Sequence, residues 1–256
     1  MSLRTTIIKK LVVLSMLGWS ERGVEAQRAR QEKTSKYVRL PGDIQCQPVS
    51  ANGVLAEWIE TPGIGSGMLL YLHGGAYALG SINTHREWIA RLARATNTRA
   101  LAIDYRLAPE HPYPAALDDA LTAYRWLVKG DNPPSPIIIA GDSAGGGLTL
   151  AMLVALRDAG NPMPAGAVCL SPWTDLALTG ASIHSKAEAD PMLSPEGLKK
   201  YASYYAGSHD LTTPLISPLY ANLKGLPPLL IQVGSDEILL DDAVRTGQAP
   251  SVAAVV

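Results

Sequence analysis

A serine that could act as a nucleophile lies in the segment Gly141-Asp142-Ser143-Ala144-Gly145, which has the pattern G-x-S-x-G. The segment follows the apolar run 137–140 and precedes a stretch of helical period at 148–156. A sharp turn between strand and helix strains the serine backbone and exposes its hydroxyl, and the helix N-terminus favours the negative charge that develops during attack on a carbonyl. This context predicts the nucleophile of an acyl-transfer reaction; the alternative is a glycine-rich turn that closes tightly on a helix.

Donors for the developing oxyanion are expected in the adjacent glycines Gly74 and Gly75, which follow the apolar run 68–72. Losing one preorganised donor typically costs about 2.7 to 4 kcal/mol of barrier lowering. We expect the backbone amides of Gly74, Gly75 and Ala144 to form the oxyanion hole. His73 precedes the two glycines within a loop motif, so we expect it to anchor the loop rather than to act as a base.

The elements that must position these groups are predicted by alternating apolar runs and segments of helical period. Short runs that are apolar throughout are typical of strands buried on both faces, and a stripe of apolar residues at helical spacing suits a helix that covers a sheet. The expected strands are residues 54–59, 68–72, 100–103, 137–140, 167–170 and 229–233. The pattern predicts an α/β fold with a mostly parallel sheet.

Three separated blocks resemble the bacterial hormone-sensitive-lipase family of esterases. They are His73-Gly74-Gly75, the segment DYRLAPEHPYPAA at 104–116, and Gly141-Asp142-Ser143-Ala144-Gly145. The segments SPWTDL at 171–176 and DPML at 190–193 are similar to further family segments, so the resemblance covers at least residues 54–245. Ala76 stands where the family usually has a third glycine, and its backbone amide should preserve the hydrogen bond if its φ is accessible.

This resemblance implies an α/β-hydrolase fold, a small helical cap, no cofactor and hydrolysis of short- to medium-chain acyl esters. It also implies frequent homodimers. The expected division is an N-terminal helical cap segment at 1–45 and a hydrolase core at 46–256, with a segment near 176–213 returning to the cap. Tyr77, Trp173 and Met192 are candidates for the substrate pocket, although core packing explains each equally well.

The resemblance places the triad acid at Asp236, just beyond the run 229–233, where a buried carboxylate would orient the imidazole of a histidine. Asp241 and Asp242 are expected to be surface charges of a helix. The order Ser, Asp, His requires a histidine after Asp236, and none is present in the sequence.

The four histidines other than His73 are expected to be surface or loop residues rather than substitute bases: His85, His111, His184 and His209. We therefore expect a truncation or frameshift near Thr246, a missing C-terminal strand and helix, and low or no activity. A catalytically impaired or non-catalytic ligand-binding protein of the same fold is the alternative function. Amidase or peptidase activity is a lesser alternative within enzymes.

Composition limits the partners. The net charge of -1 and the scattered Lys and Arg residues argue against nucleic acid, and the five histidines and two cysteines show no metal-ligand spacing. The basic and apolar residues 9–19 imitate a secretory signal, but the charged residues that follow favour an amphipathic lid helix and a cytoplasmic location. The apolar run is shorter than the roughly 20 residues of a membrane span, so we expect no stable membrane anchor.

Overall fold

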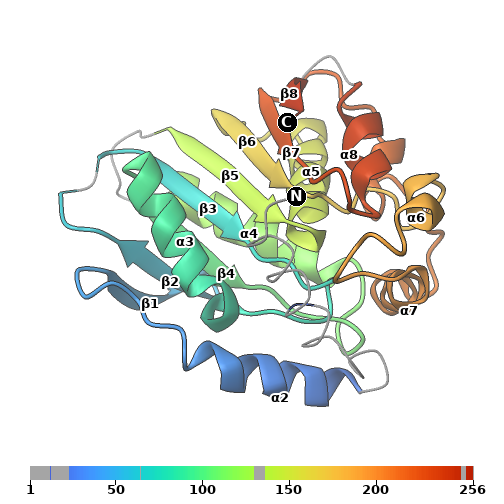
Figure 1. Cartoon of the computed structure of the whole chain (residues 1–256). Helices are drawn as coiled ribbons and strands as arrows, with labels where there is room; N and C mark the ends of the chain where they lie inside the picture. The colour runs from blue at the N-terminus through green and yellow to red at the C-terminus, as the bar shows by residue number, and fades with distance from the viewer. Residues whose placement is uncertain (1–11, 13–22, 64, 130–135, 249–251, 256) are drawn as a thin grey trace.

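The structure is a computed structural model that describes residues 12, 23–63, 65–129, 136–248 and 252–255. The lid helix or signal expected at residues 9–19 lies outside these residues apart from Val12. Within the described chain, one sheet holds eight strands in the order β1-β2-β4-β3-β5-β6-β7-β8, with helices on both of its faces (Figure 1). This arrangement is the predicted α/β-hydrolase architecture, so that expectation is confirmed.

The sheet is parallel from β4 to β8 and antiparallel at its N-terminal edge, where β1 pairs with β2 and β2 pairs with β4. Each expected strand is present within one or two residues of its predicted bounds. The strands are β1 (Gln45–Ala51), β2 (Val54–Glu60), β3 (Met68–Leu72), β4 (Arg99–Asp104), β5 (Ile137–Asp142), β6 (Gly166–Leu170), β7 (Leu229–Gln232) and β8 (Val252–Val255).

One face of the sheet is covered by helix α3 (Ile82–Thr96), which buries Ile89, Ala90 and Ala93 against β2, β3 and β4. The other face is covered by α4 (Ala115–Lys129) and α5 (Ala144–Asp158), which belong to the larger apolar cluster. The α5 helix is buried almost all round because it packs on β5, β6 and α4. These two layers hold the central strands β3 and β5, whose carboxyl ends carry the candidate site.

The C-terminal end of the sheet corrects one expectation. Helix α8 (Leu240–Thr246) follows β7, and β8 then pairs parallel with β7, so a C-terminal helix and strand are present rather than missing. The run Val252-Ala253-Ala254-Val255 has β-branched residues at both ends, which suits a strand. It also satisfies backbone groups of β7 that an open edge would leave unpaired.

The N-terminal helix α2 (Val24–Ser35) lies within the segment expected to form the cap, and it is not amphipathic. It has no apolar stripe, and its one buried residue is Gln27. Side-chain hydrogen bonds hold it instead: Arg28 donates to the carbonyl oxygens of Ala78 and Ala108, each at 2.8 Å, and to the Glu110 carboxylate. The Tyr201 hydroxyl donates to the Gln27 side chain and thereby joins α2 to helix α7 (Pro195–Ala206).

The remaining described elements lie between β6 and β7, and the first two of them lie in the segment near 176–213 that is expected to return to the cap. They are helix α6 (Ser182–Ser185), α7 and a single 3-10 turn, η1 (Pro218–Tyr220). Tyr201, Tyr204 and Tyr205 are all on α7, and Tyr201 and Tyr205 are buried. No helix among the described residues has both the length and the apolarity needed to cross a membrane.

Candidate active site

Ser143 lies in the turn between β5 and α5 with φ 52° and ψ -119°, a conformation that is strained for a residue with a side chain. Its amide donates to the Leu170 carbonyl oxygen at 2.8 Å, and its own carbonyl oxygen accepts from the Trp173 amide at 2.9 Å. The flanking Gly145 is required because a Cβ there would lie 2.0 Å from the Leu72 carbonyl oxygen. Close contact with β3 and β6 therefore holds this turn in place.

The loop after β3 turns sharply beside Ser143. Gly75, Ala76 and Tyr77 all have positive φ, at 120°, 53° and 59°. At Gly75 a Cβ would lie 2.2 Å from the Leu79 carbonyl oxygen, so glycine is required by space as well as by conformation. Ala76 thus adopts the left-handed conformation that a third glycine would adopt with less strain.

The expected oxyanion donors need one correction. The Gly74 amide donates to Asp142 Oδ1 at 3.0 Å and is therefore not free to bind an oxyanion. The amides of Gly75 and Ala76 donate to no atom of the described residues, and the Ala144 amide is at the start of α5, where it has no intrahelical acceptor. The available donors are Gly75, Ala76 and Ala144, with Ala76 in place of Gly74.

Asp142, the second residue of the G-x-S-x-G segment, connects the two loops. Its Oδ1 accepts from the Gly74 amide and from the Tyr71 hydroxyl, the latter at 2.8 Å, while Trp88 Nε1 donates to the Tyr71 oxygen at 2.9 Å. Burial by itself would raise the pKa of Asp142, but the contact with His85 and the Tyr71 hydrogen bond lower it below its ordinary value. Asp142 is therefore ionised at neutral pH, a property that the G-x-S-x-G pattern alone does not indicate.

His73 is buried in the base of the loop. Its ring stacks on Tyr105 with centroids 4.2 Å apart, its Nδ1 lies 2.8 Å from the Gly74 carbonyl oxygen, and its own carbonyl oxygen accepts from the Tyr105 hydroxyl at 2.7 Å. Burial is the main reason why its pKa falls to about 4, so the ring is neutral at neutral pH. These contacts agree with an anchoring role for His73.

A cavity of about 470 Å³ opens on Ser143. It is bounded by α2, by the loop after β3, by the first turn of α3, by the loop at 190–194 and by α7. Its lining residues are Gln31, Gly74, Gly75, Ala76, Leu79, Gly80, His85, Asp142, Ser143, Asp190, Pro191, Met192, Leu193, Ser194, Gly197, Leu198, Lys200 and Tyr201. Of the expected pocket residues, Met192 is on this lining, while Gln31, Leu198 and Tyr201 were not anticipated from the sequence.

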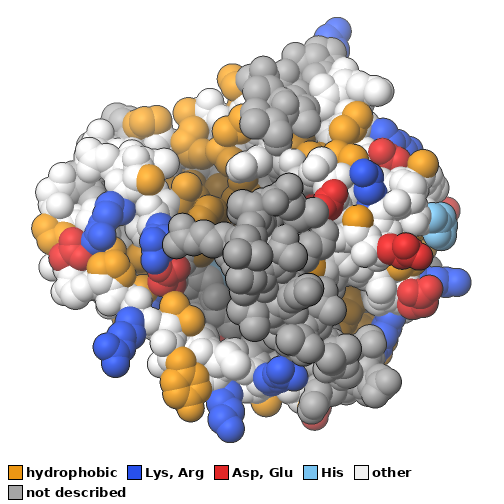
Figure 2. Space-filling view, in the orientation of Figure 1, with side chains coloured by type: hydrophobic (Ala, Val, Ile, Leu, Met, Phe, Trp, Pro, Cys, Tyr) orange, Lys and Arg blue, Asp and Glu red, His pale blue; other side chains and the backbone are white. Residues whose placement is uncertain are grey.

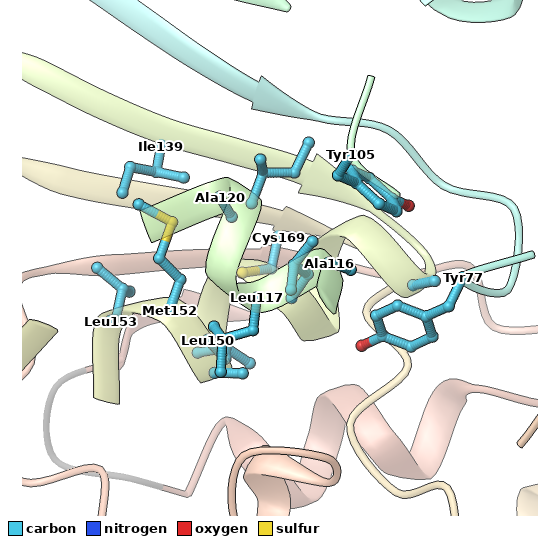
Figure 3. Close-up of a cluster of buried hydrophobic side chains, with 14 of the residues drawn as sticks. Tyr77, Tyr105, Ala116, Leu117, Ala120, Ile139, Leu150, Met152, Leu153 and Cys169 are labelled. Carbon is cyan, nitrogen blue, oxygen red and sulfur yellow. The ribbon is translucent and has the colours of Figure 1, made fainter. Parts of the chain in front are cut away.

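The other two expected pocket residues, Tyr77 and Trp173, do not line this cavity. Both are buried, and the Tyr77 ring stacks on Tyr205 at 3.7 Å and lies 6.1 Å from the Trp173 ring. Figure 3 shows Tyr77 in the buried apolar cluster that also contains Leu117 and Cys169. The alternative of core packing holds for both residues.

Asp236 lies in the turn after β7 and is exposed rather than buried, and it does not line the cavity. Nearby, Asp190 joins this turn to the cavity: its Oδ1 accepts from the amides of Met192 and Leu193 at 2.8 and 3.0 Å, and its Oδ2 accepts from the Ile238 amide at 3.0 Å. The turn that carries Asp236 is thus tied to the cavity wall, but its carboxylate lacks the expected burial.

Asp242 corrects the expectation of surface charges on α8, because its side chain is fully buried. Its Oδ2 accepts from the amides of Thr174 and Asp175 at 2.7 and 2.8 Å, and its Oδ1 has no hydrogen-bond partner among the described residues. Burial, opposed by these two amides, raises the pKa of Asp242 to about 7. Asp241 is partly buried and accepts from the Ser182 amide at 2.9 Å.

A pH-dependent stability follows from Asp242. Because its pKa is higher in the folded than in the unfolded chain, the folded state binds the extra proton between about pH 4 and pH 7. The contribution of Asp242 to the free energy of unfolding should therefore fall as pH rises across this window, by up to about 1.4 kcal/mol per pH unit, and stay level above it. Urea denaturation at pH 5, 6, 7 and 8 measures this dependence.

The matched variant is Asp242→Asn, which resembles the protonated side chain and keeps an oxygen for the amides of Thr174 and Asp175. The wild type should gain stability relative to this variant as pH falls from 8 to 5. Parallel pH profiles for the two proteins would show that Asp242 does not titrate in this range.

The comparisons with known proteins agree with this geometry. A family model described as "alpha/beta hydrolase fold" matches residues 69–255. An acetyl-hydrolase of Streptomyces hygroscopicus is 43% identical over 249 residues, which are 95% of this chain and 81% of that protein. An esterase of Acinetobacter venetianus is 41% identical over 204 residues, 79% of this chain and 67% of that protein.

Solved structures show the same similarity across the whole chain. A crystal structure titled as an esterase from the bacterial hormone-sensitive lipase family has a TM-score of 0.90 and 43% identity and covers 97% of this chain and 86% of that chain. A mutant of the esterase E40 has a TM-score of 0.94 and 42% identity and covers 100% of this chain and 88% of that chain.

Proposed function

Since the chain belongs to the α/β-hydrolase fold family and, within it, to the hormone-sensitive-lipase family of carboxylic ester hydrolases, we propose that it cleaves short- to medium-chain acyl esters at Ser143. The observation that carries the proposal is the position of Ser143. Its strained turn opens on a cavity beside the N-terminus of α5 and beside the amides of Gly75 and Ala76, which donate to no atom of the described residues.

In the proposed reaction, Ser143 Oγ loses its proton to a base and bonds to the acyl carbon of the ester. The carbonyl oxygen becomes an oxyanion that accepts from the amides of Gly75, Ala76 and Ala144. The intermediate collapses, the bond to the alcohol oxygen breaks, and the alcohol leaves with a proton from the base. Water then releases the acid from the acyl-enzyme by the same steps.

The base in this scheme is a histidine oriented by Asp236, and the sequence has no histidine after Asp236. A serine without its base is a poor nucleophile. Oxyanion stabilisation and substrate binding can still leave a rate enhancement of about 10³ to 10⁴ over the reaction in water. We therefore propose that this chain by itself has low activity. The segments 1–45 and 176–213 are proposed to form the cap over the cavity.

The test is covalent labelling of Ser143 with a fluorophosphonate, read by mass spectrometry of the modified peptide. We expect one adduct on Ser143 after prolonged incubation, because the oxyanion hole favours attack on the phosphorus even when the base is absent. The Ser143→Ala variant should remain unlabelled. Two results would exclude the esterase proposal. One is an adduct that forms equally well in the Ser143→Ala variant, and the other is the absence of any adduct even after a histidine is restored at the C-terminus.

A non-catalytic ligand-binding protein is the second candidate, and the exposure of Asp236 favours it. It predicts binding of an uncleaved ester in the same cavity, together with no adduct on Ser143. The labelling experiment thus separates the two functions. Amide analogues of the same acyl group, compared with the esters, separate amidase activity from esterase activity.

Charged side chains of both signs lie on the face shown in Figure 2. On the face in Figure 2, Lys and Arg side chains lie scattered among Asp and Glu side chains, without a basic patch in the described part of that face. The described residues also contain no group of three or more His, Cys, Asp and Glu side chains that could hold a metal ion. The proposal rests on the serine and its surrounding amides.

A further inference from the structure

His85 is a titratable side chain of the cavity wall that the proposed mechanism does not use. It lies in the first turn of α3, and its side chain is 20% exposed and lines the cavity together with Ser143. The sequence alone predicts a surface or loop residue at this position. His85 therefore lines the same cavity as the nucleophile, and its contacts indicate its role.

Both nitrogens of the His85 ring face groups of the protein. Nδ1 is engaged by the first turn of its own helix, at 2.8 Å from Thr84 Oγ1 and 3.2 Å from the Ser81 carbonyl oxygen. Nε2 faces Asp142, at 3.5 Å from Oδ2. This distance is long for a hydrogen bond, so attraction between the charges is the main component of the contact. The ring is thus held between α3 and Asp142.

The contact continues from Asp142 to the oxyanion loop. The Asp142 oxygen that does not face His85, Oδ1, accepts from the Gly74 amide at 3.0 Å. Gly74 directly precedes Gly75 and Ala76, whose amides are the proposed oxyanion donors. A Cβ on Gly74 would lie 2.2 Å from Asp142 Oδ2, so the loop and the carboxylate are packed without spare space. A displacement of the carboxylate would therefore displace the loop.

We propose that His85 is a positioning residue for ester cleavage: it holds the Asp142 carboxylate, and through it the Gly74 amide, so that the amides of Gly75 and Ala76 point at the oxyanion. This inference rests on the proposed function of Ser143. His85 acts through Asp142 and does not touch the reacting atoms.

The charge of His85 depends on the groups that face it. Burial disfavours the imidazolium, but Asp142 on β5, the Ser81 carbonyl oxygen and Asp104 on β4 favour it, and the net effect raises the pKa of His85. The neutral His73 ring, with its centroid 5.4 Å away, is a further titratable group beside His85. The His85 imidazolium and the Asp142 carboxylate therefore form a charged pair at the lower end of the neutral pH range. His85 loses its positive charge as the pH rises.

The first test follows the coupling without using activity. In two-dimensional NMR spectra recorded across a pH series, the Gly74 amide and the His85 ring should shift with the same midpoint. In Asp142→Asn the His85 midpoint should fall and the Gly74 amide should no longer follow it. A Gly74 amide that ignores the His85 titration in the wild type would overturn the proposal.

The second test uses the second-order rate of fluorophosphonate labelling at Ser143. His85→Leu removes the contact with Asp142 and should slow labelling about tenfold, because small misplacements of reacting groups carry large rate losses. His85→Gln keeps a donor toward Asp142 and should restore most of the rate. The matched control is His184→Leu, which changes an exposed histidine outside the cavity lining and should label like the wild type.

The pH profile separates positioning from a merely structural role. The ratio of the wild-type rate to the His85→Leu rate cancels the pH dependence of the serine itself, and it should fall as pH rises through the His85 midpoint. A ratio that stays constant, or equal rates in folded wild type and His85→Leu, would overturn the proposal. If Ser143 itself is not labelled in any protein, the proposed function fails instead, and the NMR coupling still decides the contact.

Discussion

Replacing residues 247–256 with a His-bearing C-terminal segment from one of the related esterases should raise the rate of p-nitrophenyl acetate hydrolysis by about 10³-fold or more. The reason lies in the proposed mechanism: Ser143 has its strained turn and nearby amides, but the histidine that the mechanism requires is not among residues 237–256. A histidine that reaches both Ser143 and Asp236 would remove the hydroxyl proton during attack and protonate the leaving alcohol. Values of kcat and KM for the two proteins measure the gain, which should appear mainly in kcat.

The control for this replacement is the same segment with its histidine changed to alanine. Because the segment also alters packing around β7 and α8, an equal rise with the alanine version would assign the gain to folding and contradict the missing-base explanation. Asp236→Asn, introduced into the His-bearing protein, should lower its kcat by a large factor, because the triad acid holds the imidazole in its productive tautomer. An unchanged kcat in Asp236→Asn would assign the acid to another residue.

The central strands β3, β4 and β5 were predictable because they are buried on both faces, so their sequences are continuous apolar runs bounded by turn residues. The edge strand β1 was not, because its sequence QCQPVSA contains no apolar run and most of its residues are exposed. Pro48 lies in this strand, where an edge position tolerates a residue without an amide hydrogen. Local sequence therefore predicts buried strands, whereas the formation of an edge strand depends on the strand with which it pairs.

The site was predicted in part for a related reason. The motif around Ser143 indicates a turn whose geometry follows from its glycines, and the structure has that turn. The partner of each amide depends on residues distant in sequence, so the engagement of Gly74 by Asp142 and the approach of His85 required the fold. The burial of Asp242 also depends on residues distant in sequence. The amides of Thr174 and Asp175, which donate to its carboxylate, belong to the loop after β6 and not to α8.

The polar helix α2 is an element whose place in the fold cannot be predicted from hydrophobic periodicity. Its sequence VEAQRARQEKTS is helical but has no apolar face, so hydrophobic pattern predicts neither its position nor its partners. The contacts of Arg28 with Ala78, Ala108 and Glu110 place it over the cavity side of the molecule, at the lower edge in Figure 1. Hydrogen bonds of this kind are specific but leave no periodic signal in the sequence.

Gly145→Ala should destabilise the protein by more than about 4 kcal/mol, although alanine favours a helix over glycine by about 1 kcal/mol in an open position. The sign reverses because the added Cβ would lie 2.0 Å from the Leu72 carbonyl oxygen and 2.6 Å from that of His73. Both obstacles are backbone atoms at the end of β3, which cannot rotate away as a side chain could. The first turn of α5 would have to move off the sheet.

This displacement would separate the Ser143 turn from the oxyanion loop, because the loop begins at the same backbone that the Cβ meets. We therefore expect any folded Gly145→Ala protein to lose fluorophosphonate labelling as well as stability, as measured by urea denaturation and mass spectrometry. Gly42→Ala is the matched control, since a Cβ there meets nothing within 4 Å. If Gly145→Ala were as stable as Gly42→Ala and still labelled at the wild-type rate, close packing of α5 on β3 would not be what positions the nucleophile.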